Sequence, residues 1–192
     1  MDSNSLIKEL KRLNLYVFTT NDIKIITNSP YANIICNRLC KRGIIQQIER
    51  GKYCLPGTSP YIIASRILTP SYIALTSAFR FHNITTQLPI KIIVFSTKYH
   101  KMLKGIKFIK VSKRLMFGYD EYNNAYVSDV EKTFIDDIWY HKGKLHADEE
   151  LEIAIMKKTL NLEKLKSYAQ VLMDKKVVRE LRIKLKKFNI NF

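Results

Sequence analysis

The sequence has few of the features that build secreted or membrane proteins. It contains three cysteines, Cys36, Cys40 and Cys54, an odd number that fits no disulfide framework. No apolar run approaches the roughly 18 residues that cross a bilayer. No leader of charged and then apolar residues precedes a small-residue cleavage site. We therefore expect a cytoplasmic protein without membrane association.

Acidic residues are absent from a long central stretch. From Arg50 to Tyr119 the sequence has no Asp or Glu, although basic residues recur throughout. The whole chain has 33 basic and 17 acidic residues, a formal net charge of +16. Such a charge favours a polyanionic partner. The alternative explanation is a general enrichment in lysine, in which case the charge contributes only to solubility. The acid-free stretch favours the first explanation, and we expect a continuous positive surface there.

Patterns typical of catalysis or metal binding are also missing. The four histidines are scattered, and none lies near the cysteines, where a zinc site would need a fourth ligand. The one acidic cluster in the middle of the chain has structural explanations. Its first members suit a helix N-terminus, and Asp136 lies one turn after Lys132. The cluster is Asp129, Glu131, Asp136 and Asp137. We expect no catalytic residues, metal or cofactor, and hence no enzyme.

The most informative stretch is 20–55, which predicts a helix, a short turn, a second helix and a hairpin. Thr20 and Asn21 are candidate N-caps for the first helix. Pro30 suits the first position of the second helix. That helix is expected to run to Arg42 and to end at Gly43. A preceding helix over 6–14, with Ser5 as its cap, would support the pair.

The second helix is predicted to have two different faces. At about 100° per residue, Ala32, Ile35 and Leu39 fall on one side. The opposite side has amides and cations, which contact base edges and phosphates in a major groove. The following hairpin has a basic tip at 50–52. The predicted DNA-binding residues are Tyr31, Asn33, Ile34, Asn37, Arg38, Lys41, Arg42, Gln46, Arg50 and Lys52. The alternative is a helical subdomain without a ligand.

The rest of the chain predicts a second domain. Two prolines and a glycine within 56–60 suggest a linker. Helices are expected over 61–68 and 69–82, and strands over 90–96, 104–111, 115–119 and 125–127. A helix from Ser128 to Trp139 would have a capping box between Ser128 and Glu131. Three C-terminal helices would cover 148–159, 162–173 and 175–188. The fold class is α+β. Residues 1–57 form a winged helix-turn-helix, and 58–192 form a mixed α/β domain with a small sheet and a helical C-terminus.

Five blocks of sequence stand out by their order and spacing: Arg50–Tyr53, Pro70–Ala78 with His82, Thr85–Pro89, Met116–Tyr119 and Glu131–Asp136. Together these blocks resemble the AbiEi-type antitoxins of type IV toxin–antitoxin, or abortive-infection, systems. The resemblance covers roughly 5–140, and Asn83 stands where the family pattern has glycine.

This resemblance implies a repressor that binds double-stranded operator DNA and autoregulates its operon. It also implies an antitoxin with a role in antiviral defence that counteracts a nucleotidyltransferase-type toxin. The alternative is a basic interaction protein that binds RNA or a toxin without operator-specific repression. The protein would be a monomer or a homodimer, and its last helix could form the dimer surface or cover its own sheet.

Overall fold

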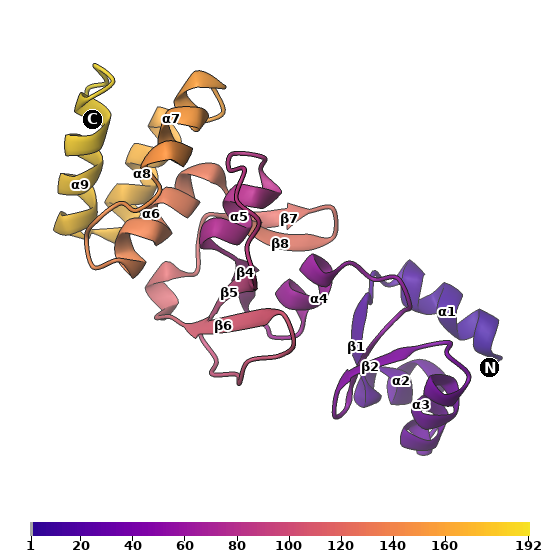
Figure 1. Ribbon diagram of the computed structural model, residues 1–192. Helices are drawn as coiled ribbons and strands as arrows, with labels where there is room; N and C mark the ends of the chain where they lie inside the picture. The colour runs from indigo at the N-terminus through magenta and orange to yellow at the C-terminus, as the bar shows by residue number, and fades with distance from the viewer. Residues whose placement is uncertain (1) are drawn as a thin grey trace. The chain divides into compact units, whose positions relative to one another are not determined.

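The computed structural model describes residues 2–192. The chain divides into two compact units, Met1–Ile67 and Leu68–Phe192. Each unit has its own hydrophobic core and its own sheet (Figure 1). The α+β class is therefore confirmed. The first unit extends ten residues beyond the predicted boundary at residue 57, because the helix α4 (Pro60–Arg66) packs against a strand of that unit.

The first unit begins with α1 (Ser3–Arg12), β1 (Val17–Thr19), α2 (Thr20–Thr27) and α3 (Ala32–Lys41). The hairpin of β2 (Gln46–Glu49) and β3 (Lys52–Cys54) follows. β3 pairs with β1 on its other side, so the sheet order is β1-β3-β2. The sequence did not predict the strand β1. A core of buried apolar residues from all three helices and the sheet holds the unit together.

Three predicted helix starts in this unit were wrong. Asp2, rather than Ser5, caps α1, and its side chain accepts a hydrogen bond from the Ser5 amide at 2.9 Å. Thr19, rather than Thr20 or Asn21, caps α2 and forms a capping box with Asp22. α3 starts two residues after Pro30, because the preceding turn extends through Tyr31. The predicted stop is confirmed, since Gly43 has a φ of +68°.

The second unit contains a mixed sheet of five strands in the order β6-β5-β4-β8-β7. Its strands are β4 (Ser71–Ile73), β5 (Ile92–Ser96), β6 (Ile106–Lys110), β7 (Tyr119–Tyr122) and β8 (Ala125–Ser128). β5 and β6 are parallel, as are β4 and β8, whereas the other two pairs are antiparallel. The predicted strands that became β5, β6 and β8 are confirmed.

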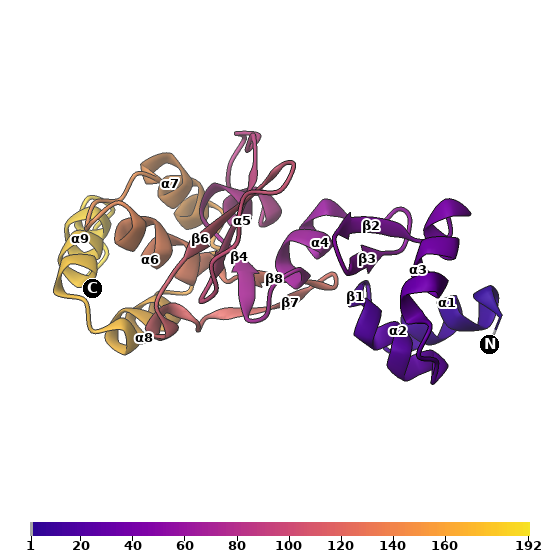
Figure 2. The same cartoon turned by 90° about the horizontal axis from the view of Figure 1, so that it is seen from below.

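Helices account for the rest of the second unit. They are α5 (Leu75–Phe81), α6 (Val130–Tyr140), α7 (Asp148–Met156), α8 (Leu162–Leu172) and α9 (Lys175–Lys186), with a 3₁₀ helix η1 at Lys113–Leu115. α6 contacts α5, α8 and α9, and both views show the last three helices grouped beside it (Figures 1 and 2). The three C-terminal helices are confirmed, and Asn161 and Asp174 cap α8 and α9.

Two predictions in this unit failed, the first of them because a buried strand resembles a helix in sequence. The expected helix over 69–82 is instead β4 followed by α5. β4 is paired on both edges and all three of its residues are buried, so it shows no apolar–polar alternation. The strand expected over 115–119 is also wrong, since 113–115 form η1 and β7 begins at Tyr119.

The predicted capping box of α6 is absent. Ser128 still belongs to β8, and its hydroxyl donates to the Ile73 carbonyl and bonds the Thr133 hydroxyl. The Glu131 carboxylate accepts a hydrogen bond from the Asn161 amide at 2.7 Å. Both side chains therefore connect α6 to other elements instead of satisfying its first turn.

Candidate nucleic-acid interface

The two faces of α3 lie as its periodicity predicts, except that Ile35, which was expected on the buried face, is only partly buried. Ala32, Cys36 and Leu39 are buried in the core of the first unit. The opposite side is exposed to solvent along the whole helix. We call this exposed side the α3 outer face, and it consists of Asn33, Ile34, Asn37, Arg38 and Lys41. It presents two amides, two cations and one apolar side chain, and no carboxylate.

The remaining predicted residues surround this face or lie on the hairpin. Tyr31 and Arg42 flank α3 at its two ends, and both are exposed. The Arg42 guanidinium donates a long hydrogen bond of 3.4 Å to the Ser3 hydroxyl, so α1 positions it. Gln46 on β2 and Arg50 at the hairpin tip are also exposed.

Lys52 is the exception among the predicted residues. Its Nζ donates to the Ile67 carbonyl at 2.7 Å and lies 3.0 Å from the Glu49 carboxylate. The side chain is half-buried, and its ammonium group is paired with these two groups of the first unit. Arg50 is therefore the exposed cation at the tip, where Gly51 has a φ of +78° and accepts a hydrogen bond from the Thr20 amide.

Sequence reasoning missed Gln47 as an exposed neighbour of this interface. Strand alternation predicts that Gln46 and Gln47 point to opposite faces. Both are exposed, because β2 is an edge strand and its pairing with β3 becomes irregular between Gln47 and Glu49. An edge strand cannot be distinguished from an inner strand by its own residues, so no local signal marked Gln47.

Burial disfavours the thiolate form of the three cysteines behind this interface. Burial raises the pKa of the Cys36 thiol to about 11 and also raises the pKa values of Cys40 and Cys54. Within residues 2–192, no group of three His, Cys, Asp or Glu side chains could hold a metal ion.

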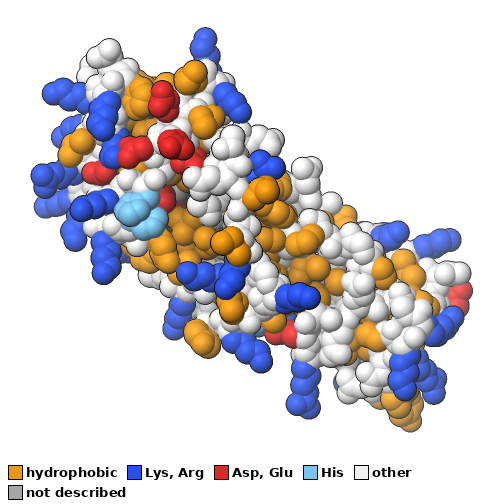
Figure 3. Space-filling view, viewed as in Figure 1, with side chains coloured by type: hydrophobic (Ala, Val, Ile, Leu, Met, Phe, Trp, Pro, Cys, Tyr) orange, Lys and Arg blue, Asp and Glu red, His pale blue; other side chains and the backbone are white. Residues whose placement is uncertain are grey.

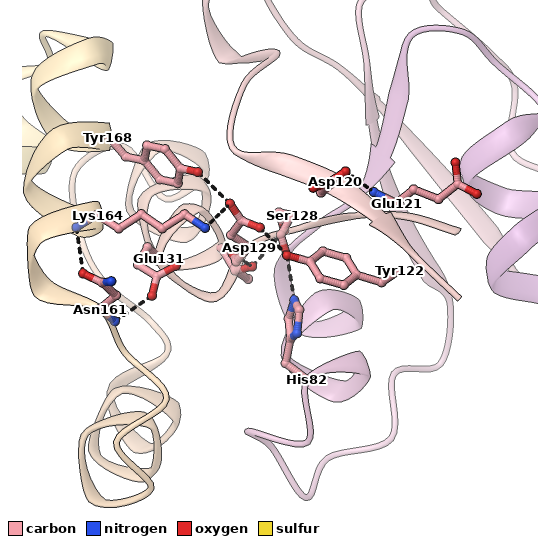
Figure 4. A network of polar contacts seen from close by, with 11 residues as sticks. His82, Asp120, Glu121, Tyr122, Ser128, Asp129, Glu131, Asn161, Lys164 and Tyr168 are labelled. Carbon is pink, nitrogen blue, oxygen red and sulfur yellow. Dashed lines mark hydrogen bonds and ion pairs between the residues drawn. The ribbon is translucent and has the colours of Figure 1, made fainter. Parts of the chain in front are cut away.

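The acidic cluster of the second unit, Asp129, Glu131, Asp136 and Asp137, forms internal networks instead of an open site. The Asp129 carboxylate accepts from the hydroxyls of Tyr122 and Tyr168, both at 2.6 Å, and lies 2.9 Å from Lys164 Nζ (Figure 4). Burial acts to raise the pKa of Asp129. The three donors outweigh that effect, so its pKa lies below the usual range. Burial and the bond to Asp129 raise the pKa of Tyr122 to about 12.

A second network is completely enclosed. The predicted pair of Lys132 and Asp136 is confirmed as a direct ion pair, and the Tyr72 hydroxyl bonds to both side chains. Neither charged side chain is exposed to solvent. Burial raises the pKa of Asp136 despite its cationic partner. A substrate could not reach these groups from solvent, so the network supports the fold.

His82 is also structural. Its Nε2 lies 2.7 Å from the Ser128 carbonyl oxygen (Figure 4). Asn83, which follows it, ends α5 with a φ of +56°, a conformation that asparagine tolerates in place of glycine.

These observations define a two-unit α+β protein whose first unit displays a polar and cationic helix face. Residues 5–56 match the family described as transcriptional regulator, AbiEi antitoxin. The resemblance to AbiEi-type antitoxins is thereby confirmed for the N-terminal segment. The match ends before the second unit, so the blocks between 70 and 136 remain a resemblance. No curated protein matches the chain, and no helix among the described residues is long and apolar enough to cross a membrane.

Proposed function

We propose that the protein is a transcriptional repressor whose first unit is a winged helix-turn-helix that binds operator DNA. The observation that carries this proposal is the α3 outer face, which is exposed along the helix and has amides and cations but no carboxylate. Asparagine side chains pair with adenine edges, and arginine and lysine pair with guanine edges or phosphates. From Asn33 to Lys41 the helix extends about 12 Å, which corresponds to three or four base-pair steps of about 3.4 Å.

The hairpin supplies the wing of this arrangement. Arg50 is exposed at its tip and is suited to a phosphate contact beside the helix. Lys52 is engaged by Glu49 and Ile67, so it contributes less than its place in the sequence suggested. Ile34, which is 47% exposed, is placed to contact a thymine methyl group.

Binding to the DNA upstream of the chain's own coding region tests the proposal. Asn37→Ala should weaken operator binding by about 1–3 kcal/mol and leave unrelated DNA nearly unaffected. Arg50→Ala should weaken both DNAs alike and reduce the slope of log K against log salt by about 0.9, the value for one phosphate contact. Lys52→Ala is the matched control on the same hairpin and should change that slope less. If Asn37→Ala and Arg50→Ala both bind like the wild type, the proposed interface is wrong.

We further propose that the protein is an antitoxin that represses its own operon and counteracts a nucleotidyltransferase-type toxin. A reporter fused to the operon's promoter should be derepressed by Asn37→Ala. In cells whose growth is arrested by a co-transcribed nucleotidyltransferase, co-expression of this protein should restore growth. The Asn37→Ala variant should restore growth as well, if the second unit carries the antitoxin activity. A toxin that remains lethal in the presence of the wild-type protein would refute this part of the proposal.

The antitoxin role requires no catalysis by this chain. Asp136, a member of the acidic cluster, is fully buried against Lys132 and Tyr72. Asp136→Asn should therefore leave nuclease and nucleotidyl-transfer assays at the same background as the wild type.

A second candidate function is favoured by the acid-free stretch. Its lysines are exposed around β6 in the second unit, which would suit a basic interaction protein that binds RNA. These lysines are Lys98, Lys101, Lys104, Lys107 and Lys110. The ratio of operator to unrelated-DNA affinity separates the two functions. Under the repressor proposal, Lys101→Glu with Lys104→Glu preserves this ratio, whereas Asn37→Ala lowers it.

A further inference from the structure

The C-terminal helices form a groove that the proposed repressor function does not use. It has a volume of about 490 Å³ and lies along one face of α9 beside the last turn of α8. We call it the α8–α9 groove. Its apolar lining includes Met173, Val178 and Ile183, and its cations are Lys175, Arg179 and Arg182. The α9 residues among these recur at helical spacing, so they form one continuous stripe.

The apolar part of this groove is unusually exposed for helix residues beside a core. Met173 is 87% exposed and Ile183 is 47% exposed. Met173 ends α8 in a left-handed conformation, with a φ of +54°. The buried face of α9, formed by Val177, Leu181 and Leu185, already packs into the unit's core. Met173 and Ile183 therefore form a second apolar surface that the chain itself leaves uncovered, whereas Val178 between them is partly buried against the core.

The charged side chains that line the groove are three cations and one carboxylate. In the part of the chain that the structure describes, no ion pair is recorded for Lys175, Arg179 or Arg182. The one carboxylate in the lining, Asp174, accepts a hydrogen bond from the Lys176 amide and caps α9. Blue side chains are grouped over this end of the unit in the space-filling view (Figure 3). A partner that covers the groove must therefore supply negative charge.

We propose that the α8–α9 groove binds an acidic amphipathic helix of a partner protein. From Lys175 to Ile183 the stripe is about 12 Å long, slightly more than two helical turns. A helix of that length can place apolar side chains at i, i+4 and i+7 on the floor and carboxylates opposite the three cations. A nucleic acid would use the cations but would leave the apolar floor uncovered. A second copy placed symmetrically would bring like charges together.

A synthetic peptide tests this proposal with the full-length protein. The probe is a fluorescein-labelled helical peptide with leucines at i, i+4, i+7 and i+11 and mostly glutamates elsewhere. Anisotropy should show saturable binding to the wild type. Arg179→Glu combined with Arg182→Glu should weaken it at least tenfold, which corresponds to about 1.4 kcal/mol. Met173→Asn should weaken it several-fold, and asparagine tolerates the left-handed conformation at that position.

Two controls separate groove binding from general charge attraction. Lys8→Glu combined with Lys11→Glu makes the same change in charge at the same i,i+3 spacing on the exposed face of α1, and it should leave peptide affinity within twofold. A scrambled peptide of identical composition should bind at least tenfold more weakly.

Several results would overturn the proposal. They are equal weakening by both charge reversals, equal binding of the scrambled peptide, or no saturable binding at all. Displacement of the peptide by a generic DNA duplex at stoichiometric concentration would assign the groove to nucleic acid. A wild-type dimer that dissociates in the Arg179→Glu and Arg182→Glu variant would assign it to a second copy. None of these outcomes depends on operator binding, so the repressor proposal stands or fails separately.

Discussion

Replacing Asp129 with asparagine should destabilise the second unit strongly, although the side chain keeps its shape. Asp129 is 6% exposed and receives hydrogen bonds from Tyr122 on β7 and Tyr168 on α8, with Lys164 close by. Its side chain makes no capping hydrogen bond to α6. Its contribution therefore comes from connecting the β7–β8 hairpin and α8 to the start of α6.

The magnitude follows from the number of donors. A hydrogen bond to a charged acceptor contributes about 1.5–3 kcal/mol. Asparagine retains one acceptor oxygen but places an NH₂ group where one donor pointed, and it removes the charge opposite Lys164. Because Tyr122 and Tyr168 are only partly buried, water replaces part of the loss. We expect about 2–3 kcal/mol, and at roughly 3–5 °C per kcal/mol for a unit of this size, a Tm lower by about 6–15 °C.

The pH dependence of this difference is a sharper test than its size. The folded-state pKa of Asp129 is lowered, so its stabilisation is fully present above the unfolded pKa of about 3.9 and disappears as pH falls through the folded pKa. The Tm difference between wild type and Asp129→Asn should be constant from pH 8 to 5 and should shrink below about pH 4. Asp120→Asn is the matched control, because that carboxylate is exposed on the same hairpin. A pH-independent difference, or a loss of under 0.5 kcal/mol, would refute the reasoning.

Three further changes should affect stability by separate mechanisms. Lys132→Met leaves the Asp136 carboxylate buried without its cation, so urea unfolding should show a loss of about 3–5 kcal/mol. Adding Asp136→Leu should recover part of that loss. Gly118→Ala should cost about 1–3 kcal/mol, because its Cβ would lie 2.9 Å from Tyr168 and 3.1 Å from Lys132 at a φ of +64°. Gly57→Ala, also at positive φ but with open space around it, should cost less in the same assay. Thr19→Ala should lower the free energy of unfolding of the first unit by about 1 kcal/mol, because it removes the cap of α2.

The candidate interface could be predicted from sequence because it depends on one helix. The 3.6-residue periodicity of α3 separates Ala32 and Leu39 from Asn37 and Lys41, and packing in the first unit follows that separation. The state of Lys52 could not be predicted, because its partner is a carbonyl group fifteen residues further along the chain. Sequence patterns describe which face a side chain occupies, but not which distant backbone group it meets.

The second unit was harder to predict because its central strand is short and enclosed. β4 has three residues, each paired or packed on every side, so its apolar sequence fits a helix equally well. The capping box of α6 failed for a related reason. Ser128 and Glu131 have the right spacing, but Ile73 and Asn161 offer tertiary hydrogen bonds that the local pattern cannot reveal. The C-terminal helices were easier, because exposed amphipathic helices with Asn161 and Asp174 caps carry their signals locally.

The distribution of buried charges makes the accessible surface more cationic than the composition suggests. Among the described residues, the buried carboxylates outnumber the buried lysines by five to one. The carboxylates are those of Asp129, Glu131, Asp136, Asp137 and Glu150, and the lysine is Lys132. At long range, the formal net charge of +16 determines the electrostatic attraction to a polyanion and hence the association rate. At contact, the side chains within reach are depleted of acids, especially on the α3 outer face and around the α8–α9 groove. Because the acids are fixed by internal hydrogen bonds such as those of Asp129, a binding partner cannot draw them to the surface without unfolding the networks that stabilise the second unit.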